Sequence, residues 1–374
     1  MSMNGSRNWH VTRSAIAFLL FSCAASLYAQ NKPTIDCTPS FPFKQSWWGA
    51  DAAYSIPLPD GRSVWIFGDT LYGDRRAMVG NEPRMVRNSI GVSTCNDRDG
   101  WKIEYFIRRG DVGQPHDFFQ PQHKNTWYWA LDGFVYKNDL WVTLLCVRNS
   151  PKKTAAALGF ETCGSDLAKI SGLDGDPQKW DATYFPLVRD GIRAYPSATA
   201  VVEADYAYIF ALLETDSRPM LLTRIPLDDL DAPAEHLQYL SKSGSWKPGL
   251  KPADAMRVMK HGNTEMTVRY QPELKEWIAV MNYPKLFSDA IVVRTAPQLT
   301  GPWSDGKVIY RVPEMQKGNV GYDKDTFCYA GKEHTEFRQP GSLLITYACN
   351  SMNVKKLASD LNIYFPKAVR VPFP

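Results

Sequence analysis

Two aspartates, Asp51 and Asp69, lie at equal distances on either side of one predicted turn. Proline, aspartate and glycine at 59–61 favour a three-residue hairpin loop, which pairs Leu58 with Arg62. Counting outward along both strands, this register places Asp51 opposite Asp69, with Cβ atoms about 4.5–5.5 Å apart. Two carboxylates so close raise the pKa of one of them, so that one holds a proton while the other is ionised. Glycoside hydrolysis requires such a proton donor, together with a carboxylate that acts as nucleophile or base.

The same acids have structural alternatives. Asp69 could cap a turn, and Asp51 could form a salt bridge with Arg62, Arg84 or Arg87. An error of one residue in the register would place the two acids on opposite faces of the sheet.

The elements that would position these acids follow from an internal repeat of about 65–80 residues, longer than most propeller repeats. Each copy has an extended run, a tight turn and an apolar strand. The five copies pair 48–58 with 63–68, 130–136 with 140–147, 195–202 with 206–213, 264–270 with 276–281, and 329–337 with 342–348.

Further strands are predicted at 89–93, 182–187 and 290–294, and short helices or loops at 152–157 and 227–239. No long amphipathic helix is predicted, so the chain is expected to be all-β, a five-bladed β-propeller in one domain at 30–374. The alternative architecture is a two-sheet sandwich or two stacked β domains.

In a propeller the first strand of each blade lines the central channel. The repeat therefore brings together Asp51, Asp132, Ser197, Glu265 and His334. Nearby aromatic and polar side chains could stack on sugar rings or bind their hydroxyls. The predicted substrate-binding residues are Trp48, Arg87, Asn88, Tyr128, Trp129, Asp132, Glu265 and His334. Alternatively, Trp48 fills the core, His334 is structural, Arg87 and Asn88 only hold the acids, and Glu333 and Glu336 are solvated.

Composition excludes several other functions. The net charge of the 374 residues is +4 and no block of lysine and arginine occurs, so no nucleic-acid partner is expected. The 6 histidines are scattered and no metal-binding or nucleotide-binding motif is found, so we expect no metal and no cofactor. A calcium ion in the channel would be the exception. We expect a monomer whose partner is a polysaccharide.

The N-terminus is typical of an exported protein. Basic residues precede an apolar run at 15–21 that is too short to span a bilayer, and small residues lead to a cleavage site after Ala29. We therefore predict a signal peptide at 1–29 and a secreted or periplasmic protein without stable membrane insertion. Lipoprotein processing at Cys23 is the alternative.

The remaining cysteines are even in number, which suggests disulfides in an oxidising compartment. Cys328 and Cys349 flank one turn nearly symmetrically, and Cys146 and Cys163 flank a loop in the same way. Cys37 and Cys95 are then left for each other, although some of these cysteines could be buried free thiols.

Several blocks resemble the domain-of-unknown-function families 4185 and 5005, over almost the whole chain from Trp47 to Pro374. The blocks are Trp48-Gly49-Ala50-Asp51, 57–62, 65–70, Arg87-Asn88-Ser89, Tyr128-Trp129 with Asp132-Gly133, Gly301-Pro302-Trp303 and 347–351.

Part of this group is glycoside hydrolase family 183, whose members are endo-D-arabinanases. The resemblance implies a five-bladed propeller, cleavage of arabinofuranosyl chains, and Asp51 and Asp69 as the essential aspartates. This sequence departs from the family at Ala130-Leu131 and at Tyr195-Pro196-Ser197, where the substrate would lie. A carbohydrate-binding propeller without catalysis is the alternative function.

Overall fold

A computed structural model of the chain describes residues 36–44, 46–74, 84–150, 159–283, 288–353, 355–360 and 362–373. The predicted signal peptide, the alternative site at Cys23 and the segment 152–157 lie outside these residues. In the described part of the chain, no helix is long and apolar enough to cross a membrane.

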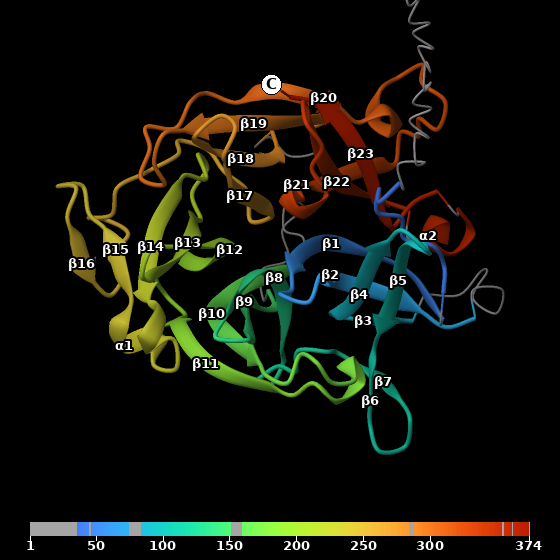
Figure 1. Cartoon of the computed structure of the whole chain (residues 1–374), viewed down its shortest axis with the longest axis horizontal. Coiled ribbons are helices and arrows are strands. Elements are labelled where there is room, and N and C mark those ends of the chain that lie inside the picture. The colour runs from blue at the N-terminus through green and yellow to red at the C-terminus, as the bar shows by residue number, and fades with distance from the viewer. Residues whose placement is uncertain are drawn as a thin grey trace, which may run out of the picture. The chain divides into compact units, whose positions relative to one another are not determined.

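Five antiparallel sheets surround a central axis (Figure 1). The first contains β1 (Trp47–Pro57), β2 (Ser63–Tyr72), β3 (Met85–Val86), β4 (Ser89–Asn96) and β5 (Gly100–Phe106). The second contains β8 (Thr126–Tyr136), β9 (Asp139–Asn149), β10 (Phe160–Ile170) and β11 (Ala182–Arg189). The third contains β12 (Ala194–Glu203), β13 (Tyr206–Leu213), β14 (Met220–Pro226), β15 (Gln238–Leu240) and β16 (Trp246–Pro248).

The fourth sheet contains β17 (Met266–Gln271), β18 (Glu276–Asn282), β19 (Ala290–Ala296) and β20 (Lys307–Arg311). The fifth contains β21 (Thr326–Glu333), β22 (Ser342–Ser351) and β23 (Pro366–Pro372). A small ribbon of β6 (Arg108–Arg109) and β7 (Pro115–His116) lies outside the sheets, and α2 (Lys355–Ser359) follows β22.

The inner strands β1, β8, β12, β17 and β21 contact one another in order, and β1 also contacts β22, which closes the ring. The predicted five-bladed β-propeller is therefore confirmed, and the two-sheet sandwich is wrong. The five predicted strand pairs are present, with one difference in the last copy. There the inner strand ends at Glu333, and Thr335–Phe337 forms a 3₁₀ turn instead of continuing the strand.

The predicted short helices at 227–239 are confirmed in part. A 3₁₀ turn spans Leu227–Asp229 and α1 spans Pro233–His236, but β15 begins at Gln238.

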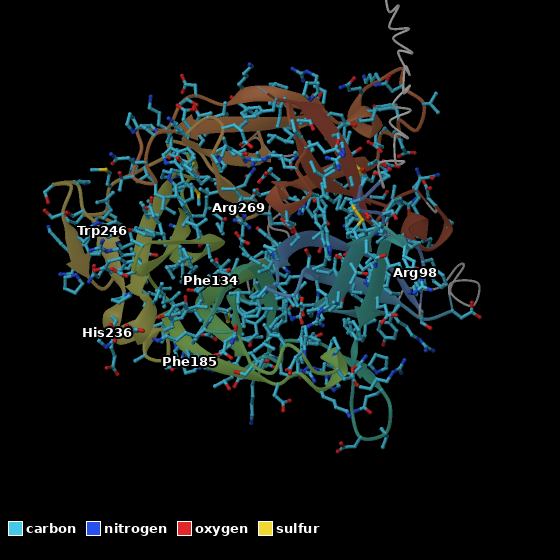
Figure 2. The ribbon with its side chains drawn as sticks, in the orientation of Figure 1. Arg98, Phe134, Phe185, His236, Trp246 and Arg269 are labelled. Carbon is cyan, nitrogen blue, oxygen red and sulfur yellow. A yellow bond between two sulfur atoms is a disulfide. The ribbon has the colours of Figure 1, made fainter. Side chains whose placement is uncertain are left out.

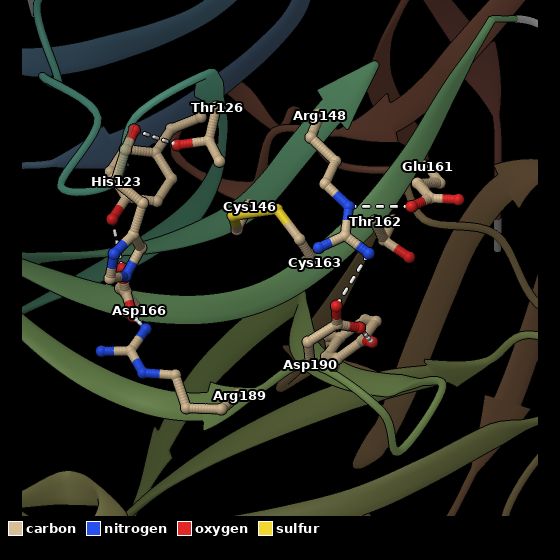
Figure 3. The surroundings of a disulfide bond; sticks show 12 residues. His123, Thr126, Cys146, Arg148, Glu161, Thr162, Cys163, Asp166, Arg189 and Asp190 are labelled. Atoms are coloured by element: carbon tan, nitrogen blue, oxygen red, sulfur yellow. Dashed lines mark hydrogen bonds and ion pairs between the residues drawn. A yellow bond between two sulfur atoms is a disulfide. The ribbon is translucent and has the colours of Figure 1, made fainter. Parts of the chain in front are cut away.

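The predicted disulfides are all formed: Cys37–Cys95, Cys146–Cys163 and Cys328–Cys349. Cys146 and Cys163 join β9 to β10 (Figure 3). Beside this disulfide, the Arg148 guanidinium lies 2.8 Å from Glu161 and 2.8 Å from Asp190, so the end of the second sheet is also held by charge.

A buried ion pair spans the centre of the ring. Arg269 of β17, near the centre in Figure 2, donates from Nη2 to Asp132 Oδ1 at 2.8 Å and from Nη1 to Oδ2 at 2.9 Å. The Asp132 carboxylate also accepts from Thr199 Oγ1 at 2.6 Å and from the Ala200 backbone at 3.0 Å. These bonds join the second, third and fourth sheets through one fully buried carboxylate.

Replacing Asp132→Asn should lower the free energy of unfolding by about 3–5 kcal/mol, because the Arg269 charge would stay buried without its counter-ion. Urea denaturation followed by tryptophan fluorescence measures this change. Asp228→Asn is the matched control, since Asp228 pairs with Lys137 at the exposed surface and should matter little. Equal midpoints for the two variants would contradict the prediction.

Candidate active site

Two β-bulges in the first sheet position Asp51. From the turn outward, β1 and β2 keep the predicted register as far as the pair Tyr54 and Ile66. Ala53 is then an extra residue, and beyond Ala52 the single residue Asp51 lies opposite both Gly68 and Asp69. The two shifts cancel, so Ala50 pairs with Thr70 as a simple count would give. The predicted direct pairing of Asp51 with Asp69 is therefore wrong, because the bulge replaces it.

The backbone after Asp51 is strained. Ala52 and Ala53 have φ values of 64° and 61°, in the left-handed region that residues with a Cβ rarely adopt. Such conformations persist only where surrounding structure holds them, and they cluster at functional sites.

The bulge turns the Asp51 carboxylate over Gly68. A Cβ atom at residue 68 would lie 2.3 Å from Asp51 Oδ1, so only glycine leaves room for this carboxylate. From the neighbouring fifth sheet, the Tyr329 hydroxyl donates to Asp51 Oδ2 at 2.7 Å, and Asn350 Nδ2 lies 3.4 Å from that hydroxyl. Tyr329 and Asn350 of the fifth sheet therefore hold the Asp51 side chain of the first sheet in place.

Asp69 has a different set of partners. Arg87 Nη1 lies 3.2 Å from Asp69 Oδ2, and the Arg87 guanidinium lies 4.4 Å from the centre of the Trp127 ring. The Arg87 backbone donates to Asp117 Oδ1 at 2.7 Å. Asp69 Oδ1 is buried and has no hydrogen-bond partner among the described residues. This oxygen therefore has unused acceptor capacity, although it has almost no exposed surface.

A third carboxylate, Glu265, lies at the end of the fourth sheet. Lys332 Nζ is 3.4 Å from Glu265 Oε1, although the Lys332 side chain has no exposed surface. The same ammonium donates to the Ala330 carbonyl at 2.9 Å and lies 4.5 Å from the centre of the Tyr54 ring. A buried cation thus adjoins the acids, whereas the Asp69 and Glu265 side chains keep 22% and 23% of their surface exposed and can meet a ligand.

The two aspartates differ in their ionisation. Burial, with the neighbouring charges of Asp69 and Glu265, raises the pKa of Asp51 well above its usual value. Burial also raises the pKa of Asp69, to about 6, and the positive charge of Arg87 opposes that rise. Both acids therefore hold a proton more tightly than a free aspartate does, and only Asp69 has an arginine beside it that favours the ionised form.

Two predicted channel residues have their polar atoms bonded inside the protein. His334 is buried, with Nδ1 hydrogen-bonded to Ser55 Oγ at 2.6 Å and Nε2 to Thr346 Oγ1 at 2.7 Å. Asp132 uses both oxygens in the ion pair described above. His334 was expected to occupy the position in the fifth sheet that Asp51 occupies in the first. This is wrong, because the bulge that directs the inner strand toward the axis lies at 330–331 in the fifth sheet, before His334.

Asn88 and Tyr128 are also buried. Asn88 bonds to the backbone of Phe119 and Tyr128, and the Tyr128 hydroxyl donates to Asp166. Neither side chain is available to a sugar in this arrangement.

The predicted stacking residues differ in exposure. Trp48 is only 7% exposed and donates from Nε1 to the Gly73 carbonyl. Trp129 is half-buried, with Phe160 against its edge. Of the predicted binding residues, Arg87 and Glu265 lie beside the aspartates, whereas Trp48, Asn88, Tyr128, Asp132 and His334 support the fold.

Sequence reasoning did not identify Tyr329, Lys332, Asn350 and Asp117 as members of the site. The fifth repeat begins at Tyr329, so its place in an inner strand was a usable signal. The alternative that Glu333 is solvated is wrong, because Glu333 and its neighbour Lys332 are both buried. No local pattern marks Asp117, which reaches the site through the Arg87 backbone.

The fold and the site together define a five-bladed propeller in which Asp51, Asp69 and Glu265 lie near the axis, as does the buried pair of Asp132 and Arg269. Residues 40–372 match the family described as a domain of unknown function, DUF5005, and the chain belongs to that family. No curated protein matches the chain.

Solved structures are similar in fold. A candidate hydrolase of Bacteroides ovatus ATCC 8483 has 20% identity and a TM-score of 0.66, covering 87% of this chain and 86% of that chain. A family 117 glycoside hydrolase of Zobellia galactanivorans has 14% identity and a TM-score of 0.48, covering 90% and 89%. An α-L-arabinofuranosidase of Podospora anserina has 9% identity and a TM-score of 0.44, covering 90% and 94%.

Replacing Arg87→Gln should raise the pKa of Asp69 above about 6 by roughly one unit, because the opposing positive charge is lost. Carboxyl NMR titration of selectively labelled protein measures the shift. Arg148→Gln removes a guanidinium that pairs with Glu161 and Asp190 instead, so it should leave Asp69 unchanged. The same Asp69 pKa in both variants would exclude the assigned role of Arg87.

Proposed function

We propose that the protein is a secreted glycoside hydrolase that cleaves a polysaccharide with Asp51 and Asp69. The observation that carries this proposal is the different surroundings of the two acids: Asp51 accepts from the neutral Tyr329 hydroxyl beside two further acids, whereas Asp69 is paired with Arg87. The disulfides are in accord with export to an oxidising compartment.

In the proposed mechanism Asp51 is the general acid. It gives its proton to the oxygen of the departing sugar, and the Tyr329 hydroxyl stabilises the carboxylate that is left. Glu265 keeps the proton on Asp51 before the reaction, because its negative charge raises the pKa of Asp51.

Asp69 is the nucleophile or the base in this mechanism. Arg87 pairs with its Oδ2, its Oδ1 makes no hydrogen bond within the described residues, and the part of the side chain that stays exposed would meet the sugar or a water molecule. Of the acids near the axis, Asp132 is excluded from this role, because Arg269 and three further donors occupy its oxygens.

Arabinofuranosyl chains are the proposed substrate, and this choice rests on the sequence resemblance to glycoside hydrolase family 183. The site itself supports only the reaction class. A panel of arabinans, arabinogalactans and other plant and bacterial polysaccharides therefore has to accompany any test of activity.

Asp51→Asn and Asp69→Asn should each reduce oligosaccharide release by about 10³-fold or more, because each removes one of the two groups that the reaction requires. Release from the panel is measured by chromatography, with Asp228→Asn as the control of equal chemistry at the exposed surface. Activity that survives both substitutions would place the active site elsewhere. Binding of a panel member without any hydrolysis by the parent protein would favour the carbohydrate-binding alternative.

The raised pKa values also predict a stability cost. The folded protein holds protons on Asp51 and Asp69 more tightly than the unfolded chain does, so stability falls as the pH rises from about 4 through about 6 and beyond. Asp51→Asn should remove part of this loss and melt at a higher temperature than the parent protein at pH 8. Thermal melts at pH 4 and pH 8 measure the difference, and a variant that melts lower at pH 8 would contradict it.

A further inference from the structure

A cleft of about 740 Å³ lies far from the acids, between the outer parts of the third and fourth sheets. It is lined by Trp246 of β16, the segment 256–260, Arg294 of β19 and the segment 300–305. Trp246 lies at the outer edge of the ring and Arg269 near its centre (Figure 2). None of the residues of the acid cluster lines this cleft.

Two tryptophans in the cleft are held in place by their neighbours. The Arg224 guanidinium lies 4.2 Å from the centre of the Trp246 ring, and Tyr208 meets that ring at its edge. Trp303 donates from Nε1 to the Leu299 carbonyl at 3.0 Å. Gly301 has a φ of 95°, and a Cβ there would lie 2.9 Å from the Trp303 backbone nitrogen. The two indoles are therefore fixed before any ligand arrives.

The charges in the cleft are mostly positive. Arg257 and Lys260 are exposed and make no ion pair with any described residue, and Asp305 is the only carboxylate in the lining. Arg294 is only 6% exposed; its Nη1 donates to the Ser304 carbonyl at 2.9 Å, but its Nε has no partner in the described chain. Arg294 therefore has one unused donor at the cleft, and the charge of Asp305 also acts on its guanidinium.

We propose that this cleft is a second binding site, for an acidic oligosaccharide. The flat apolar faces of sugar rings pack on the Trp246 and Trp303 indoles. The carboxylates or sulfates of the ligand pair with Arg257 and Lys260 in charge-assisted hydrogen bonds, and Arg294 binds at the floor. A neutral chain cannot form these charge-assisted bonds, so the positive charge favours an acidic ligand. The site does not depend on the proposed hydrolysis, because it shares no residue with the acid pair.

Binding is tested by calorimetry at low salt with three oligosaccharides of equal length: an oligogalacturonate, a sulfated chain and a neutral chain. Arg257→Gln/Lys260→Gln should weaken binding of the acidic chains by about tenfold, because two exposed charges are lost. The matched control is Arg98→Gln/Lys317→Gln, which removes the same charge from exposed positions, with Arg98 on the opposite side of the ring (Figure 2). It should bind as the parent protein does.

Trp303→Ala should weaken binding of every oligosaccharide that the parent protein binds. If Trp303→Ala does not fold, the comparison of Arg257→Gln/Lys260→Gln with the parent protein still tests the proposal. Binding of either acidic arm that depends on Arg257 and Lys260 supports the proposal, and the preferred arm identifies the acid. The proposal is overturned if neither acidic chain binds the parent protein, if the neutral chain binds equally well, or if the two double variants bind alike. Since no turnover is measured, a failure of the hydrolase proposal would not affect this result.

Discussion

The buried ion pair between Asp132 and Arg269 is the contact on which the centre of the ring depends. Five inner strands converge there, so polar side chains at the centre, such as Asp132 and Arg269, are removed from water and need hydrogen-bond partners from other strands. A buried charge is tolerable only when it is paired and hydrogen-bonded, and Asp132 meets this need with donors from three sheets. The Tyr54 hydroxyl acts similarly, since it donates to the Ala198 carbonyl and accepts from the Met266 backbone.

A β-bulge places both Asp51 and Asp132 near the axis, but the two carboxylates differ in their partners. Bulges interrupt β1, β8, β12 and β21 at comparable positions, and each one directs part of an inner strand toward the centre. At Asp132, Arg269 of β17 makes a bidentate contact, which leaves no oxygen free. At Asp51, Tyr329 of β21 supplies a neutral hydroxyl, while Asp69 of β2 and Glu265 before β17 add negative charge that favours the protonated form. The partner, more than the position, separates a structural acid from one suited to catalysis.

This difference also explains what the sequence could predict. The turn at 59–61, the five strand pairs and the disulfides depend on residues close in sequence, or on a regular repeat, and all were predictable. The bulges beside Asp51 were not predictable. Their two register shifts cancel, so Ala50 still pairs with Thr70, as counting outward from the turn at 59–61 would give. The contact from Tyr329 to Asp51 spans 278 residues, and no local pattern carries it. His334 was misplaced for a related reason, since two residues of a bulge shift the fifth repeat relative to the first.

The radial arrangement also separates two kinds of environment. Near the axis the sheets are close together, so carboxylates are desolvated and their pKa values rise, as at Asp51 and Asp69. Toward the rim neighbouring sheets diverge, and between the third and fourth this leaves a cleft whose cations Arg257 and Lys260 stay hydrated. Shifted pKa values serve proton transfer, whereas hydrated charges beside fixed indoles serve reversible contact with a long chain. In the two proposals the chemistry lies at the axis and the contact with an extended polymer lies at the rim, and the two sites share no residue.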